Sequence, residues 1–202
     1  MRFHLVGLAA VLMTSGSNAT DLPDVTIHAV ASGATLRTGF AGHGSHVLPE
    51  IIYLKGDFAR VEFQDGRDSE HVLRDGKVKN SWLVNEARQF VLPLGNGPTA
   101  RQYFFPLERP CADFGGTCSK LGPSAVAGRA VIAWRYRNAG HGGPDGSDSG
   151  TMFLDTENGL LLGYDSADLS GRPMKWTVTS VDFGKVDPVM FTLPKAAPKK
   201  QL

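Results

Sequence analysis

Polar and apolar residues alternate in runs along the chain, and turn signals separate these runs at a spacing of about ten residues. In the run 58–64, Val61 and Phe63 share one face, whereas Arg60 and Glu62 share the other. A period of two is typical of half-buried antiparallel strands, and Gly, Asp or Asn between such runs favours tight hairpins. The turn signals are Gly-Asp at 56–57, Asp-Gly at 65–66 and 75–76, and Asn-Gly at 158–159. The pattern therefore predicts a meander of antiparallel strands.

The clearest strands are expected at 47–55, 58–64, 77–84, 88–92, 129–137, 151–156, 160–165 and 173–183. Helix is expected to be minor, because no stretch repeats apolar positions with helical spacing; the two places left for a short helix are 95–103 and 119–126. About ten sequential strands with one apolar face each must close on themselves or pack in pairs of sheets. A mainly β protein is predicted, as a closed or partly open antiparallel barrel, with a two-sheet sandwich as the second alternative.

Three segments are expected to be loops: 33–46, 95–128 and 138–150. The last contains five glycines and a proline, so it cannot continue a strand ladder and is expected to be a flexible hydrophilic loop. The predicted inner face carries large aromatic side chains, which either fill the core or line a pocket. They are Phe63, Trp82, Phe90, Trp134, Tyr164 and Trp176.

The first 19 residues predict a removable export signal. Arg2 supplies a positive start, residues 5–13 form an apolar run, and Ser17-Asn18-Ala19 offers small side chains for cleavage. That run is about half as long as a membrane-spanning helix requires. The expected mature protein is a single soluble domain at 20–194, followed by a flexible basic tail at 195–202.

Cys111 and Cys118 are the two cysteines of the chain, and an exported chain usually pairs two cysteines. Six residues separate them, unlike the two residues of a C-x-x-C redox motif, so a structural disulfide is favoured over a redox site. Closing a loop of about eight residues stabilises a fold by roughly 2.5 kcal/mol in the chain-entropy model. The bridge is therefore expected to stabilise the chain locally and not to determine the fold.

Charge and chemistry narrow the function classes further. The full chain has 21 Lys and Arg against 20 Asp and Glu, so the chain without Arg2 is formally neutral. A neutral chain argues against binding nucleic acid through its phosphates. His43 and His46 form the one histidine cluster, but a stable metal site needs a third ligand, and a solvated turn is favoured. Asp145 and Asp148 resemble calcium ligands without the acidic residue that normally closes such a site. No catalytic residue, metal or cofactor is therefore expected.

The order of the motifs resembles LolA/LolB-like proteins, the periplasmic lipoprotein-carrier superfamily. The resemblance is carried by residues 53–63, 72–76 and 82–90 with Pro93, and by 153–163, 174–183 and 187–194. It implies a half-open antiparallel barrel, usually lidded by helices, whose apolar concave face holds the acyl chains of a lipid or lipoprotein. The protein would then be a periplasmic, monomeric lipid-binding protein without catalytic residues, and the six aromatic residues would be its cavity wall.

The alternative is an envelope interaction module, in which the same aromatic residues form a filled core and the exposed loops, chiefly 138–150, dock on a partner protein. The volume of the interior distinguishes the two hypotheses. A cavity of about 300 Å³ or more favours a ligand, and a packed interior favours the module.

Overall fold

The structure is a computed structural model, and it describes residues 22–33, 47–65, 68–74, 80–95, 97–168 and 170–194. The expected export signal, the His43 and His46 pair and the expected basic tail lie outside the described residues. Within the described part of the chain, no helix is long and apolar enough to cross a membrane.

Eleven strands and three short 3₁₀ helices make up the described elements. The strands are β1 (Val25–Gly33), β2 (Leu48–Lys55), β3 (Phe58–Asp65), β4 (Asp68–Arg74), β5 (Ser81–Asn85), β6 (Phe90–Pro93), β7 (Thr117–Val126), β8 (Arg129–Arg137), β9 (Gly150–Asp155), β10 (Leu161–Ala167) and β11 (Pro173–Asp182). The helices are η2 (Ala100–Tyr103), η3 (Pro144–Gly146) and η4 (Pro188–Phe191).

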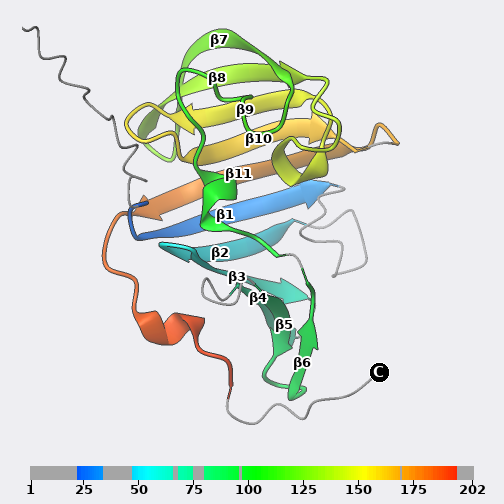
Figure 1. The fold of residues 1–202 in the computed structure, drawn as a ribbon, viewed down its shortest axis with the longest axis vertical. Helices are drawn as coiled ribbons and strands as arrows, with labels where there is room; N and C mark the ends of the chain where they lie inside the picture. The colour runs from blue at the N-terminus through cyan, green and yellow to red at the C-terminus, as the bar shows by residue number, and fades with distance from the viewer. Residues whose placement is uncertain are drawn as a thin grey trace, which may run out of the picture.

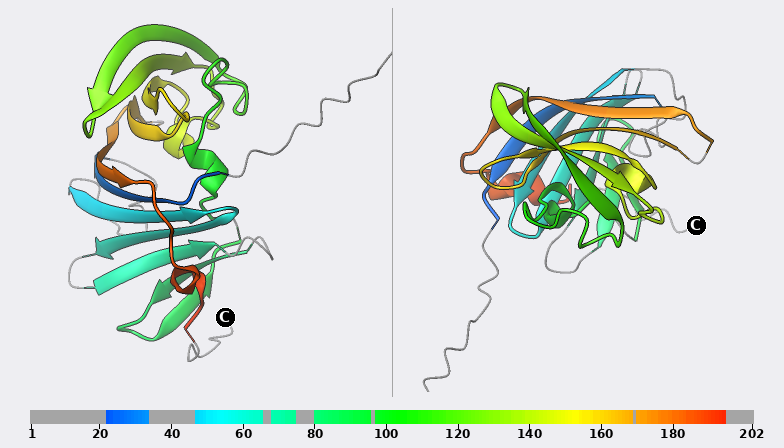
Figure 2. Two further views of the ribbon diagram at one scale, coloured as in Figure 1. Left: turned by 90° about the vertical axis from the view of Figure 1, so that its left-hand side faces the viewer. Right: turned by 90° about the horizontal axis from the view of Figure 1, so that it is seen from above.

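All eleven strands belong to one antiparallel sheet with the order β6-β5-β4-β3-β2-β1-β11-β10-β9-β8-β7. The first and last strands, β1 and β11, pair at its centre, so two meanders of consecutive strands extend from the middle to the edges β6 and β7. The sheet is strongly twisted and curved but does not close (Figures 1 and 2). The prediction of a mainly β, half-open antiparallel barrel is confirmed.

Apolar side chains cover the inner face of this sheet in register. Ile27, Ile52, Val61, Val72 and Leu83 are successive cross-strand partners on β1 to β5, and all five are buried. Residues directly opposite each other on antiparallel strands point to the same side of the sheet. The alternation seen in the sequence therefore produces one continuous apolar surface, which is called the inner face below.

The connection from β6 to β7, residues 94–116, crosses the inner face and is called the strap (Figure 1). The amide of Leu94 donates to the carbonyl of Ser81 (2.8 Å), and the amide of Phe105 donates to the carbonyl of Gly159 (2.9 Å). Between these anchors η2 places Tyr103, which is fully buried, with its ring centroid 6.3 Å from that of Trp176. Of the two places left for a short helix, 95–103 therefore contains one.

The segment after β11 covers part of the outer face of the sheet. Val186 and Phe191 pack against Leu73 of β4 and form a second, smaller apolar cluster. The carboxylate of Asp24 accepts a hydrogen bond from the amide of Val186 (3.2 Å) and pairs with the ammonium of Lys55. Both faces of the sheet are thus apolar around β4 and β5.

The expectation for residues 95–128 was wrong in its second half. Residues 119–126 contain no helix and belong to β7, which pairs with β8 at the edge of the sheet. Most of its side chains are exposed, so the strand shows no apolar alternation that could have predicted it. Gly122 lies at a register shift and Pro123 lies on the same edge strand, where a missing amide donor is tolerated.

Candidate functional site

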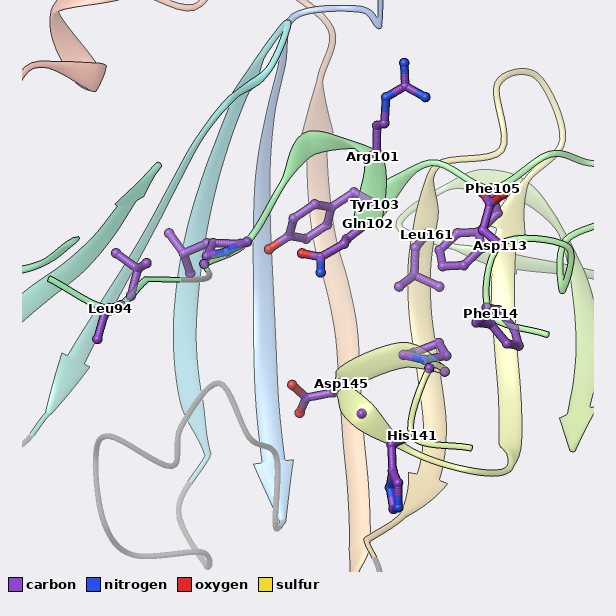
Figure 3. A pocket seen from close by; sticks show the side chains of 18 of the residues that line it. Leu94, Arg101, Gln102, Tyr103, Phe105, Asp113, Phe114, His141, Asp145 and Leu161 are labelled. Atoms are coloured by element: carbon purple, nitrogen blue, oxygen red, sulfur yellow. The ribbon is translucent and has the colours of Figure 1, made fainter. Parts of the chain in front are cut away.

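A cavity of about 900 Å³ lies between the inner face, the strap and the loop that contains η3 (Figure 3). Its lining comes from three sources: β3, β4 and β10 of the sheet, the strap, and residues 141–146 of the glycine-rich loop. The apolar and aromatic side chains among them are Val61, Phe63, Val72, Leu94, Pro98, Tyr103, Phe105, Phe114, Pro144 and Leu161. This part of the inner face is therefore not filled by the protein's own side chains, and the cavity is partly open to solvent.

The sheet contributes a rigid wall. Val61 and Phe63 of β3, Val72 of β4 and Leu161 of β10 all line the cavity and are all buried. Val61 and Val72 are direct cross-strand partners, and the ladder of β3 and β4 fixes their separation. Because strand alternation aims these side chains, the position of this wall follows from the register of the sheet.

The strap contributes the facing wall. Leu94, Phe105 and Phe114 line the cavity and are half-buried. The ring of Phe114 packs edge to face against Phe105, with centroids 6.2 Å apart, and against Tyr136, with centroids 5.8 Å apart. The strap also carries Arg101, whose side chain points away from the cavity in Figure 3.

The disulfide expected between Cys111 and Cys118 is present, with the two Cα atoms 5.7 Å apart. Cys111 lies in the strap and Cys118 lies on β7, so the bridge ties the end of the strap to the edge of the sheet. Asp113 and Phe114, which line the cavity, lie inside this covalent loop.

The loop 138–149 is not a free hydrophilic loop, contrary to expectation. Tyr136 and Ser147 form a buried hydroxyl–hydroxyl hydrogen bond, and the Ser147 hydroxyl donates to the carbonyl of Pro144 (2.6 Å). A Cβ atom on Gly143 would lie 2.5 Å from the carbonyl oxygen of Ser147, so glycine is needed for this close approach. The glycines allow the loop to pack closely against the sheet. The high glycine content of this loop therefore accompanies a packed loop and not a flexible, exposed one.

Two carboxylates of this loop hold its shape. Tyr164 donates its hydroxyl hydrogen to Oδ2 of Asp145 (3.0 Å), and Oδ1 of Asp148 accepts the amide hydrogen of Gly140 (2.9 Å). Asp145 has a positive φ of 54°, a conformation that Asp tolerates better than most residues. Among the described residues, no group of three His, Cys, Asp or Glu side chains is arranged to hold a metal ion.

The six aromatic residues predicted to form the cavity wall occupy different environments in the structure. Phe63 lines the cavity. Tyr164 and Trp176 are buried and stacked, with centroids 6.1 Å apart and planes 15° apart, and the Trp176 indole donates to Glu50 (2.9 Å). Phe90 and Trp134 are half-buried at the margin of the core.

Trp82 does not belong to the inner face, and its expected position was wrong. It is the cross-strand partner of Leu73, which packs on the outer face beneath the C-terminal segment. The neighbouring Leu83 is the residue of β5 that faces inward with Val72. Because β5 carries apolar side chains on both faces, its sequence does not indicate which face is inside.

Sequence reasoning missed most of the cavity lining. Val61, Val72 and Leu161 are aliphatic and so are not among the predicted aromatic residues, although strand alternation places Val61 on the same face as Phe63. The strap residues Leu94, Phe105 and Phe114 lie in a segment without periodicity, so no local pattern indicated their role.

No family model and no curated protein matches the chain. Among solved structures, it is similar to MucB in the MucA/MucB complex of Pseudomonas aeruginosa (14% identity, TM-score 0.53, covering 86% of this chain and 56% of that chain). It is also similar to an uncharacterised conserved protein from Thermus thermophilus (10% identity, TM-score 0.54, covering 87% of this chain and 88% of that chain). The chain spans 55% to 59% of the length of the MucB chains.

A weaker likeness connects the chain with the LolA superfamily protein NE2245 from Nitrosomonas europaea (8% identity, TM-score 0.40, covering 85% of this chain and 90% of that chain). At identities this low, the comparisons with MucB and with the Thermus thermophilus protein establish a shared fold only.

Proposed function

We propose that this protein is a non-catalytic lipid- or lipoprotein-binding protein of the periplasm, which holds acyl chains in the cavity between its sheet and its strap for transport or sensing. One observation carries the proposal: a cavity of about 900 Å³ remains open beneath the strap and is lined mainly by apolar side chains. That volume lies within the usual range of ligand sites, roughly 300 to 1,000 Å³. Phe63 is the predicted aromatic residue that would contact the ligand directly.

The physics of such a site needs no reacting group. Each methylene group buried from water gains about 0.8 kcal/mol, so about ten methylenes would gain roughly 8 kcal/mol before the cost of ordering the chain. The carboxylate of Asp145 holds the loop by accepting from Tyr164. The cavity therefore combines an apolar interior with polar groups that shape its border, as an amphiphile requires.

A fluorescence titration with a dansyl-labelled fatty acid tests the proposal. Leu94→Asp places a charge in the cavity wall at a half-buried position, and this variant should bind the probe at least about tenfold more weakly than the wild type. Leu92→Asp is the matched control, because Leu92 is 37% exposed on β6 and does not line the cavity. Equal binding by both variants, or no binding by the wild type, would contradict the proposal.

The second candidate is the envelope interaction module. It is supported by the similarity to MucB, a protein whose structure has been solved in complex with MucA(peri). In this chain the strap already fills the inner face above Trp176. If the purified protein carries no lipid and does not bind added lipid, crosslinking in the envelope should capture a protein partner instead.

A further inference from the structure

One wall of the cavity includes residues that lie inside a disulfide-closed loop. Residues 106–116 join Phe105, anchored by its amide to Gly159, to Thr117, the first residue of β7. Between described backbone groups, the hydrogen bonds of this stretch are all internal to it: Arg109 to Pro106, Ala112 to Arg109, and Phe114 to Cys111. The stretch therefore has turn structure of its own, and its backbone is not hydrogen-bonded to the sheet.

Leu107 packs against the hydrophobic core and Pro110 is buried, and two further kinds of contact hold the stretch against the rest of the molecule. The first is the disulfide between Cys111, which is buried, and Cys118 on β7. The second is the ring of Phe114, which packs between Phe105 and Tyr136. The covalent bridge begins three residues before Phe114 in the chain, so it limits how far that ring can move from the cavity.

Phe114 also connects the two parts of the lining that lie outside the sheet, because it belongs to the strap and touches the glycine-rich loop. An ideal Cβ on Gly142 would lie 2.8 Å from the Cβ of Phe114, which shows how closely the loop approaches this side chain. Figure 3 shows Phe114 and Phe105 together on the side of the cavity opposite Leu94. Displacing Phe114 would open this side of the cavity to water.

We propose that the Cys111–Cys118 disulfide is a positioning element of the ligand site: it holds Phe114 in the cavity wall and thereby sets how tightly the cavity retains an acyl chain. The inference rests on the proposed function. Its structural half, the fixation of residues 106–116, does not depend on any ligand. Without the bridge, the closed wall becomes one of several arrangements, and affinity falls in proportion to the fraction of closed molecules.

The first test measures the wall itself, by amide hydrogen exchange in the absence of ligand. In the Cys111→Ser/Cys118→Ser variant, and in the wild type reduced with dithiothreitol, amides 106–116 should exchange at least about tenfold faster, while β3 and β4 keep their protection. Phe114→Ala, with its disulfide intact, should change these rates far less. Unchanged exchange after loss of the disulfide would overturn the inference, whatever the protein binds.

The second test is a mutant cycle read by titration with the dansyl-labelled fatty acid. Loss of the disulfide and Phe114→Ala should each weaken binding roughly tenfold, and the combined variant should bind no more weakly than Phe114→Ala alone. Leu94→Ala serves as the control, because Leu94 is anchored to Ser81 and its effect should add to that of the disulfide.

The outcomes separate the two claims. Additive effects of disulfide loss and Phe114→Ala, or full affinity without the disulfide, would overturn the positioning role while leaving lipid binding intact. A wild type that binds no probe would overturn the proposed function, and the exchange rates would still show whether the bridge fixes the wall. Near-ultraviolet circular dichroism of each variant confirms that the aromatic core is folded before either measurement.

Discussion

The sheet wall of the cavity and the wall formed by the strap and the glycine-rich loop differ in what holds their side chains. Val61, Phe63 and Val72 are aimed by strand alternation and by a continuous ladder of backbone hydrogen bonds. Phe114 and Asp145 are held by ring packing, a disulfide and single side-chain hydrogen bonds. The first wall should therefore change little between ligand-free and bound states, and adjustment to a ligand should take place in the second.

The largest expected effect concerns the support shared by both walls. Trp176 stacks on Tyr164, packs below Tyr103 and donates to Glu50. Trp176→Ala should lower the free energy of unfolding by about 4 kcal/mol in a urea titration, because it leaves a large cavity beneath the strap. Trp82→Ala, at a half-buried position of the outer face, should cost about half as much or less. Equal losses would show that the strap does not rest on Trp176.

A second prediction concerns His71, which is buried on the side of the sheet opposite the cavity. Burial and, to a smaller extent, the charge of Arg60 lower the pKa of His71 from 6.5 to about 4. Between pH 6.5 and about pH 4 the unfolded chain therefore binds a proton at His71 that the folded protein does not bind. The folded protein loses stability as the pH falls through this interval. The free energy of unfolding should drop by roughly 2 kcal/mol between those values.

In His71→Gln this pH dependence should largely disappear, which thermal unfolding at several pH values can check. If the sheet wall is as rigid as proposed, probe binding should stay constant over the same interval until the protein unfolds. A gradual loss of binding before unfolding would place the pH response in the cavity and contradict the separation of the two faces.

A smaller effect is expected for the hydrogen bonds of the loop wall. Tyr136→Phe removes the bond to Ser147 and should lower the free energy of unfolding by about 1 kcal/mol. Its clearer consequence should be local, with faster hydrogen exchange at 139–147 and unchanged exchange in β3. Tyr53→Phe, which removes a hydroxyl on the outer face, is the control. Uniform acceleration across the sheet would show that the two walls are not independent.

The smallest effect is expected at Asp145, where two contributions oppose each other. Asp145→Gly loses the bond from Tyr164 but relieves the cost of a positive φ, so the free energy of unfolding should change by less than about 0.5 kcal/mol. Asp145→Ala loses the bond and keeps the strained backbone, so it should cost about 1 kcal/mol more than the glycine variant. Identical stabilities would show that the backbone at this position is not strained.

The same difference between the walls explains what could be predicted from the sequence. The inner-face position of Phe63 is predicted correctly because Val61 and Phe63 alternate with the charged Arg60 and Glu62 on β3. Trp82 was misplaced because β5 carries apolar side chains on both faces, and its cross-strand partner Leu73 lies under the C-terminal segment on the outer face. That covering contact joins residues more than one hundred positions apart, and local alternation contains no information about it.

Three elements were not predicted from residue alternation: the strap, β1 and β7. β1, the central strand, was not assigned, although Val25 and Ile27 alternate with polar residues. β7 is exposed along most of its length and is defined by its pairing with β8. Phe105 and Phe114 line the cavity because of tertiary contacts and a disulfide, so their role becomes visible only in the folded chain.

The most direct test of the lipid-binding claim is a lipid analysis of the protein purified from the envelope fraction without detergent. Organic extraction followed by mass spectrometry should recover an acyl lipid at about one molecule per protein from the wild type and from Leu92→Asp. Leu94→Asp should yield much less, because its carboxylate lies in the cavity wall. A lipid-free wild type would contradict the claim that this cavity holds acyl chains. Equal amounts of lipid per protein in Leu94→Asp and Leu92→Asp would contradict it as well.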